Sequence, residues 1–234
     1  MPASLKAVLF DAGNTLIFLD HARMASEVGT ALGMPISAAA LDGSVGAATR
    51  AVEGAAGVVA GGTDRDRARV YLETLFAGAG VPASRMEEVA RALQRLHEDW
   101  HLWCRTAPGT LESLDRLRAA GLRLGVVSNS DGRVEEALTA AGIRDRFEVV
   151  LDSALVGVEK PDPAIFRAAL AALGVAPEET LYLGDLYDVD VVGARAAGIE
   201  AVLLVPDATE SGPQCRRVES LVALADDLLT GGRS

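Results

Sequence analysis

The sequence predicts an α/β fold in which a parallel β-sheet lies between two layers of helices. Two observations lead to this prediction. In the second half of the 234-residue chain, Ala- and Leu-rich segments repeatedly end in glycine and are followed by apolar, β-rich runs. Regular alternation of helix, glycine and strand is typical of parallel βα units. Residues 19–105 interrupt this alternation with helix-like stretches. We therefore expect a Rossmann-like, three-layer parallel-sheet core with an inserted all-helical cap domain.

The predicted strands are short and continuously apolar, as expected for a sheet that is buried on both faces. The first covers residues 6–10, and the later ones cover residues 124–128, 147–151, 180–183 and 201–205. Each later strand follows a glycine that is itself followed by an aliphatic residue, which indicates a left-handed helix C-cap. These glycines are Gly121, Gly142, Gly174 and Gly198.

The inserted segment contains four helix-like stretches, at residues 22–32, 38–52, 64–77 and 84–102. A glycine-rich run at residues 54–62 predicts a flexible connection between the second and third. We interpret residues 19–105 as a cap domain, and residues 1–18 with 106–234 as the core. The alternative is that the segment merely extends the core.

Composition limits the classes of partner. The net charge is -11 and the pI is about 4.8, which argues against a nucleic acid or an anionic membrane as a partner. A phosphate site would therefore need its own local cations. Two cysteines are too few for a disulfide framework, and no apolar run reaches the roughly 18 residues of a membrane span. We expect a cytoplasmic protein, and the oligomeric state is left open.

Polar residues stand at or after the carboxyl ends of four predicted strands, so they should meet at one edge of the sheet. They are Asp11, Ser128, Lys160 and Asp185. Taken singly, each has an ordinary explanation, such as a helix cap or a solvated surface charge. Together, carboxylates at one edge would repel one another unless a divalent cation and a lysine share the site.

These four motifs, in this order and followed by the run at residues 193–198, resemble those of the haloacid dehalogenase superfamily. The similar subgroup has a helical cap inserted after its first strand, and the resemblance covers nearly the whole chain. It implies that Asp11 is a nucleophile that forms an aspartyl-phosphate. It also implies that Ser128 and Asn129 bind the phosphoryl group, and that Lys160 neutralises its charge.

The resemblance further implies a Mg²⁺ site built from oxygen ligands. Asp11 and Asp185 would supply side-chain ligands, and Gly13 would supply its main-chain carbonyl. Asp190 would be a further ligand or would stand behind the ligands, and Asp188 could do the same.

One position departs from the family pattern. Phosphatases of this type carry a second Asp two residues after the nucleophile, where it serves as general acid and base; here the residue is Gly13. A positioned acid or base typically contributes about 10²–10⁴-fold, so we expect slow turnover of alkyl phosphates. The turnover of phosphates with better leaving groups, such as aryl or acyl phosphates, should be slowed less. Asp20 and His21 could substitute, although both more often cap or solvate a helix.

The resulting hypothesis is a Mg²⁺-dependent phosphatase that acts on a small phosphorylated metabolite held between cap and core. The alternative is a weakly active or non-catalytic protein that binds phosphate or a metabolite. A metal-free dehalogenase is disfavoured, because such enzymes do not keep a metal-binding Asp at the position of Asp185. Phosphonate cleavage needs a cap lysine, and residues 19–105 contain none.

A second motif suggests another chemistry. His97, Glu98 and His101 match the H-E-x-x-H pattern of zinc proteases. No suitably spaced third His follows, and the aromatic residue Trp103 lies nearby. A packing or pocket-lining role is the favoured interpretation.

Overall fold

The computed structural model describes residues 5–54, 64–205 and 215–231. The chain divides into two compact units. We call Met1–Phe18 with Cys104–Ser234 the core unit, and Leu19–Trp103 the helical unit. Part of the predicted glycine-rich connection, from residue 55 onward, lies outside the described residues.

The core unit is built on a six-stranded parallel sheet with the strand order β5-β4-β1-β6-β7-β8. Its strands are β1 (Ala7–Phe10), β4 (Arg123–Ser128), β5 (Val149–Asp152), β6 (Thr180–Gly184), β7 (Glu200–Leu204) and β8 (Arg216–Val218). This confirms the predicted Rossmann-like α/β fold. The edge strand β8 was not predicted, because its short run is mostly arginine.

Strand β1 lies in the centre of the sheet, between β4 and β6. Leu9 lies opposite Gly125 of β4 and opposite Tyr182 of β6. After β1, the chain builds β4 and β5 on one side and then β6, β7 and β8 on the other. In open α/β sheets, ligands bind at the carboxyl ends of the strands beside such a change of direction. The topology therefore predicts that a ligand site lies at the residues that follow β1, β4 and β6.

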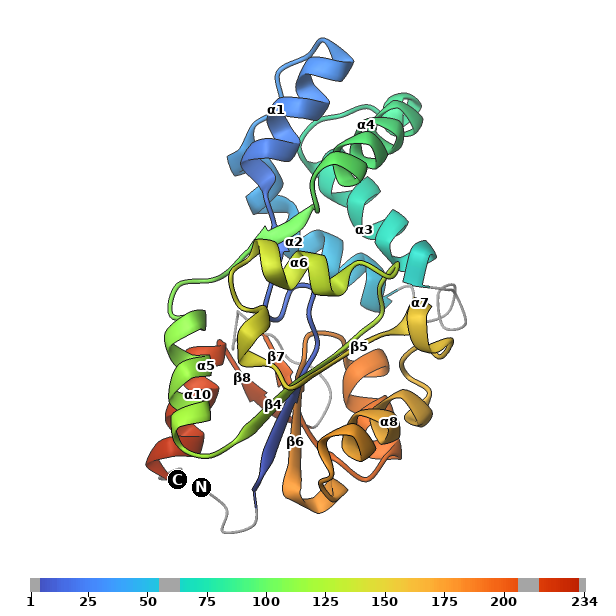
Figure 1. Cartoon of the computed structure of the whole chain (residues 1–234). Coiled ribbons are helices and arrows are strands. Elements are labelled where there is room, and N and C mark those ends of the chain that lie inside the picture. Colours follow the sequence, from blue (N-terminus) through green and yellow to red (C-terminus); the bar gives the residue numbers. More distant parts are fainter. Residues whose placement is uncertain (1–4, 55–63, 206–214, 232–234) are drawn as a thin grey trace. The chain divides into compact units, whose positions relative to one another are not determined.

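Helices cover both faces of this sheet (Figure 1). They are α5 (Thr110–Ala119), α6 (Val134–Ala140), α7 (Ser153–Val156), α8 (Pro163–Leu173), α9 (Val192–Ala196) and α10 (Leu221–Thr230). Ala7 and Leu9 belong to the hydrophobic cluster that includes α8 and α9. The alternate residues Val8 and Phe10 point to the opposite face, because successive side chains of a strand alternate. All four are fully buried, which explains the continuously apolar sequence of β1.

The predicted helix ends are also confirmed. The four glycines that precede the later strands all have a positive φ, which a residue with a side chain rarely adopts. They are Gly121 (87°), Gly142 (72°), Gly174 (61°) and Gly198 (84°).

The helical unit contains α1 (His21–Leu32), α2 (Ala38–Gly54), α3 (Asp64–Gly78) and α4 (Met86–Asp99). Its own hydrophobic core includes the fully buried Met24, Val28, Leu75 and Phe76. The helix predicted at residues 84–102 was too long. A short 3₁₀ turn precedes α4, and Trp100 has an extended backbone that ends it.

Two short strands join the units along the chain. They are β2 (Phe18–Leu19) and β3 (Trp103–Arg105), which pair with each other. Segment 19–105 is therefore helical except at its two ends, where these strands lie.

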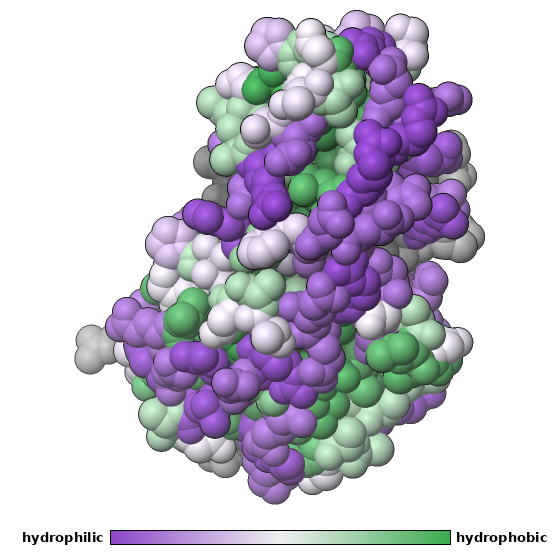
Figure 2. Space-filling view, turned by 45° about the horizontal axis from the view of Figure 1, so that its top comes forward, coloured by the Kyte–Doolittle hydropathy of each residue, from purple (hydrophilic) through white to green (hydrophobic). Residues whose placement is uncertain are grey.

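The surface shown in Figure 2 is mostly hydrophilic, with hydrophobic residues in scattered patches. Among the described residues, large hydrophobic side chains that are exposed are few: Trp100, Leu111, Leu155, Val156 and Val192. Within the same residues, no helix is both long enough and apolar enough to cross a membrane.

Candidate active site

The carboxyl edge of the sheet gathers the charged residues that the sequence singled out. Asp11 directly follows β1, and its N–H donates to Leu183 O of β6 (2.8 Å), so its backbone is still part of the sheet. Asp185 follows β6, and Asp190 lies on the π-helical turn η5 (Tyr187–Val191). Lys160 lies in the loop between α7 and α8, further from a strand end than expected.

Lys160 is the centre of this arrangement. Its side chain is 2% exposed, and its ammonium group donates to Asp11 Oδ1 (2.5 Å), Asp190 Oδ1 (2.8 Å) and the Tyr182 hydroxyl (3.0 Å). Burial disfavours the charged ammonium, but Asp11 and Asp190 more than offset this and raise the pKa of Lys160 above its ordinary value. Lys160 therefore carries a fixed positive charge against the predicted nucleophile.

Three carboxyl groups meet around this lysine. Ligand oxygens of Asp11, Asp185 and Asp190 lie within 4.8 Å of one another. Burial raises the pKa of Asp11 to about 6, with Asp190 adding to the shift and Lys160 opposing it. Burial, Asp11 and Asp190 also raise the pKa of Asp185 well above its usual range. One lysine thus does not balance these carboxylates, and a hard divalent cation with oxygen ligands would.

The residues present fit Mg²⁺ in this respect, because all three side chains offer carboxylate oxygens. Asp190 is almost fully buried and has donors on both oxygens, whereas Asp188 is exposed. Oδ1 of Asp190 accepts from Lys160 and from Tyr182, and Oδ2 accepts from the Leu186 N–H (3.0 Å). These contacts suit a residue that stands behind the metal ligands.

Gly184 allows Asp190 to reach this position. A Cβ at residue 184 would lie 2.3 Å from Cγ of Asp190 and 2.5 Å from its Cβ. Real Cβ atoms do not approach other heavy atoms so closely, so the carboxylate packs where a side chain at 184 would be. The glycine that precedes Asp185 is explained by this contact.

The loop after β1 is held by its own backbone. Leu16 and Ile17 both donate to Ala12 O (2.9 Å each), and Asn14 N–H donates to Ile17 O (2.8 Å). Asn14 has a φ of 55°, the left-handed region in which asparagine is well tolerated. Gly13 is not among the glycines with a positive φ, so its backbone torsion angle does not require a glycine.

Asn129 has a different neighbour from the one expected. Its Oδ1 accepts from the Lys160 N–H (2.8 Å), and its Nδ2 donates to Lys160 O (3.0 Å). The side chain therefore holds the backbone of the lysine loop, and a phosphate contact by Asn129 stays a prediction. Ser128 is buried at the end of β4, where its hydroxyl is 3.4 Å from Asn129 O.

Two buried residues were missed by the sequence reasoning. Asp152 ends β5 and accepts from the N–H groups of Gly132, Val134 and Ala154, so it orders the loop after β4. Asp152 could have been predicted, because it directly follows an apolar run, as Asp11 does. Tyr182 gave no signal, because a tyrosine inside an apolar strand looks like an ordinary core residue.

The suggested substitutes for the missing Asp lie in the helical unit. Asp20 caps α1 by accepting from the Arg23 N–H (3.1 Å), which is the alternative role expected for it. His21 has a carboxylate partner, because its Nδ1 lies 2.6 Å from Asp42 Oδ1.

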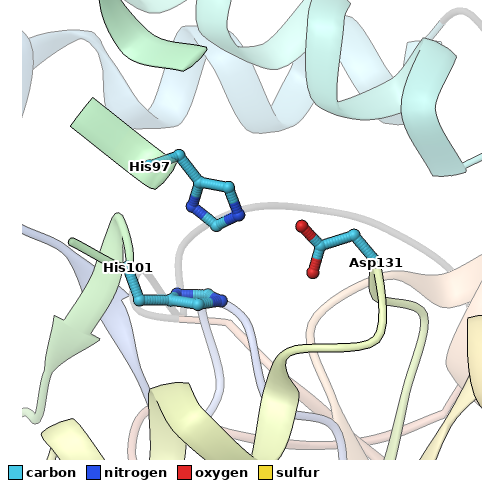
Figure 3. A group of neighbouring side chains, drawn as sticks. All are labelled: His97, His101 and Asp131. Atoms are coloured by element: carbon cyan, nitrogen blue, oxygen red, sulfur yellow. The ribbon is translucent and has the colours of Figure 1, made fainter. Parts of the chain in front are cut away.

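The two histidines of the H-E-x-x-H motif lie at the C-terminal end of α4 and just after it. His97 and His101 meet edge to face, with ring centroids 4.6 Å apart (Figure 3). His97 Nδ1 accepts from the Leu102 N–H (3.4 Å), and His101 Nδ1 donates to Trp103 O (3.2 Å). Both rings thus bind the backbone that follows the helix, and the packing interpretation stays a prediction.

A family model for haloacid dehalogenase-like hydrolases matches residues 5–198. The chain belongs to the haloacid dehalogenase-like hydrolase family. This confirms the family resemblance drawn from the motifs, whereas the subgroup with a cap inserted after the first strand stays a prediction.

Similar proteins within this family include phosphatases. The chain is 39% identical over 155 residues to a phosphoserine phosphatase of Thermus thermophilus, a match that covers 64% of this chain and 60% of that one. It is 42% identical over 139 residues to haloacid dehalogenase-like hydrolase domain-containing protein 3 of Mus musculus, with 58% and 53% covered. The chain thus spans about half to two thirds of these relatives.

Among solved structures, the haloacid dehalogenase-family hydrolase YfnB of Bacillus subtilis superposes with a TM-score of 0.70. The match covers 96% of this chain and 98% of that one at 18% identity. At this level of identity, the likeness shows the fold alone.

Proposed function

We propose that this protein is a Mg²⁺-dependent phosphatase that acts on a small phosphorylated metabolite through an aspartyl-phosphate at Asp11. The observation that carries the proposal is the buried contact between Lys160 and Asp11 (2.5 Å), with Asp185 and Asp190 beside it. A buried nucleophile, lysine and metal-binding carboxylates serve phosphoryl transfer, whereas binding alone needs no nucleophile. The phosphatase name of the Thermus relative supports the same activity. In this proposal, residues 1–18 and 106–234 form the catalytic core, and residues 19–105 form the cap.

In the first step, a carboxylate oxygen of Asp11 attacks phosphorus. The bond from phosphorus to the leaving oxygen breaks, and that oxygen takes its electron pair and a proton. Lys160 balances the charge that Asp11 and the phosphoryl group share, and Ser128 with nearby backbone N–H groups holds a phosphoryl oxygen. Mg²⁺ held by Asp11, Asp185 and the Gly13 carbonyl, with Asp190 beside them, would neutralise further charge.

In the second step, water attacks phosphorus and loses a proton. The bond between phosphorus and Asp11 then breaks, which releases inorganic phosphate and restores the carboxylate. Both steps need a group that moves a proton, and Gly13 cannot supply it. We infer that His21 is a better substitute than Asp20, because Asp20 already caps α1. Asp42 accepts from His21 Nδ1 (2.6 Å), which leaves Nε2 to give or take the proton.

The second candidate function is phosphate or metabolite binding without turnover, and Gly13 is the residue that favours it. The retained Asp185 disfavours a metal-free dehalogenase, because it joins Asp11 and Asp190 in the carboxylate cluster.

The deciding experiment measures phosphate release from a panel of phosphate esters, with Mg²⁺ and with a chelator. It compares the wild type with Asp11→Asn and Gly13→Asp. We expect Mg²⁺-dependent release by the wild type, loss of release in Asp11→Asn, and faster release in Gly13→Asp. If the wild type and Gly13→Asp are both inert while phosphate still binds, the protein is a binding protein and the phosphatase proposal is wrong.

A further inference from the structure

The hydroxyl group of Tyr182 lies inside the charged cluster. Tyr182 is on β6 and is fully buried. Its oxygen is 3.0 Å from Lys160 Nζ, 2.9 Å from Asp190 Oδ1 and 3.3 Å from Val127 O. An ammonium group can only donate, so the hydroxyl accepts from Lys160. Its own proton is then available to an oxygen acceptor, and Asp190 is the nearer one.

Packing does not explain this hydroxyl. The ring packs edge to face against Phe166 of α8, with centroids 5.0 Å apart, and a phenylalanine would keep that contact. Burying a hydroxyl costs free energy unless its hydrogen bonds are made, and here they are made to charged groups. The tyrosine therefore contributes something that an apolar residue of the same shape would not.

That contribution concerns the direction of the Lys160 side chain. An ammonium group has three N–H bonds, and here their acceptors come from three separate elements. Asp11 follows β1, Asp190 lies on η5, and Tyr182 lies on β6. Without the hydroxyl, one buried N–H would lose its acceptor and the ammonium group could rotate. Asp190 Oδ1 would also lose one of its two donors.

We propose that Tyr182 is a positioning residue, whose hydroxyl fixes Lys160 Nζ against Asp11 Oδ1 and fixes Asp190 behind it. The proposal rests on the proposed phosphatase function. It assigns Tyr182 no contact with the substrate and no part in proton transfer. Its main effect on the reaction passes through Lys160, so its loss should matter much less once Lys160 is absent.

A double-mutant cycle tests this dependence. Tyr182→Phe should lower kcat about tenfold or more, with KM changed much less, because a hydrogen bond to a charged group is lost. In a Lys160→Ala background, Tyr182→Phe should lower kcat less than about twofold. Thr180→Val is the matched control. It removes another buried hydroxyl from β6, one that bonds Ala176 O at the opposite end of the strand. It should leave kcat unchanged.

A second measurement does not need turnover. Lys6 and Lys160 are the only lysines in the chain. Acylation followed by mass spectrometry therefore measures how readily the Lys160 ammonium group is labelled, with Lys6 as an internal reference. Lys6 has a 61% exposed side chain, and Lys160 a 2% exposed one. The ratio of Lys160 to Lys6 labelling should rise severalfold in Tyr182→Phe and stay unchanged in Thr180→Val.

The outcomes separate the two proposals. Tyr182 is not a positioning residue if Tyr182→Phe lowers kcat by the same factor in the wild-type and Lys160→Ala backgrounds. The same conclusion follows if it changes neither kcat nor the labelling ratio. If the wild type releases no phosphate in an Asp11-dependent way, the phosphatase proposal fails. The labelling ratio then still decides whether the hydroxyl holds Lys160.

Discussion

The side-chain amide of Asn129 holds the backbone of Lys160 from both sides, with hydrogen bonds of 2.8 Å and 3.0 Å. The two residues are 31 positions apart, at the end of β4 and in the loop before α8. Tyr182 contacts the other end of the same lysine, its ammonium group. Lys160 is thus fixed both at its main chain and at its charge.

Asn129→Ala removes both hydrogen bonds to the lysine loop. We expect it to lower the free energy of unfolding by about 1–3 kcal/mol, because a typical intramolecular hydrogen bond contributes about 0.5–1.5 kcal/mol. Urea denaturation measures the change. Ser130→Ala is the control, because the Ser130 hydroxyl makes just one long contact within the described part of the chain, to Asp131 (3.4 Å). A stability equal to wild type, together with lost phosphate affinity, would instead assign Asn129 to the phosphate.

Gly184→Ala should disrupt the site through Asp190. The new Cβ would lie 2.3 Å from Cγ of Asp190, so either β6 or the carboxylate must move. Overpacking of this kind costs about 1–3 kcal/mol of stability. We also expect phosphate release to fall, because Asp190 holds Lys160. Gly43→Ala is the control: nothing lies within 4 Å of its Cβ, so the helix α2 should be unaffected or slightly stabilised. An active, fully stable Gly184→Ala protein would contradict this account.

The pH dependence of stability without divalent ions should report on Asp11. Burial raises its pKa from the ordinary 3.8 to about 6 in the folded protein. Between about pH 4 and pH 6, the folded state then binds more protons than the unfolded state, so stability falls as pH rises. Each pKa unit corresponds to about 1.4 kcal/mol.

Thermal unfolding in a chelator at several pH values measures this decrease, and Asp11→Asn should reduce it. Added Mg²⁺ should raise the melting temperature more at pH 7 than at pH 5, because the ion competes with protons for the carboxylates. Equal stabilisation at both pH values would argue against a metal at these carboxylates.

Most of the core unit could be predicted from the sequence for a physical reason. Strands buried on both faces must be continuously apolar, and helix ends in the left-handed region favour glycine. The carboxyl ends of those strands then bring Asp11 and Asp185 together, and the loop before α8 adds Lys160. Strand β8 escaped prediction because an edge strand such as Arg216–Val218 does not need to be apolar.

The residues around the charged groups were harder to predict. Asn129 acts on a backbone 31 positions away, and no spacing rule connects the two. Tyr182 has the burial expected of any residue in a central strand, so only the structure distinguishes its hydroxyl. The end of α4 was misplaced because the aromatic and charged residues up to position 102 keep a helical pattern, although Trp100 is extended.

The pair formed by His21 and Asp42 gives the last prediction, which concerns the proton that Gly13 cannot supply. His21→Gln keeps a polar side chain of similar size but cannot exchange a proton near neutral pH. If His21 is the acid, this change should slow release from alkyl phosphates by about 10²–10⁴-fold. Aryl phosphates with good leaving groups should be affected much less in the first step, because their departing oxygen needs no proton.

Asp42→Asn should have a smaller effect in the same direction, because it weakens the 2.6 Å contact that orients the ring. Gly13→Asp, combined with His21→Gln, should restore alkyl phosphate turnover by returning a carboxyl group to the position used by the family. Rates across a series of leaving groups measure all three effects. If His21→Gln slows every ester by the same factor, the residue has no role in leaving-group protonation, and the proton comes from the substrate or from water.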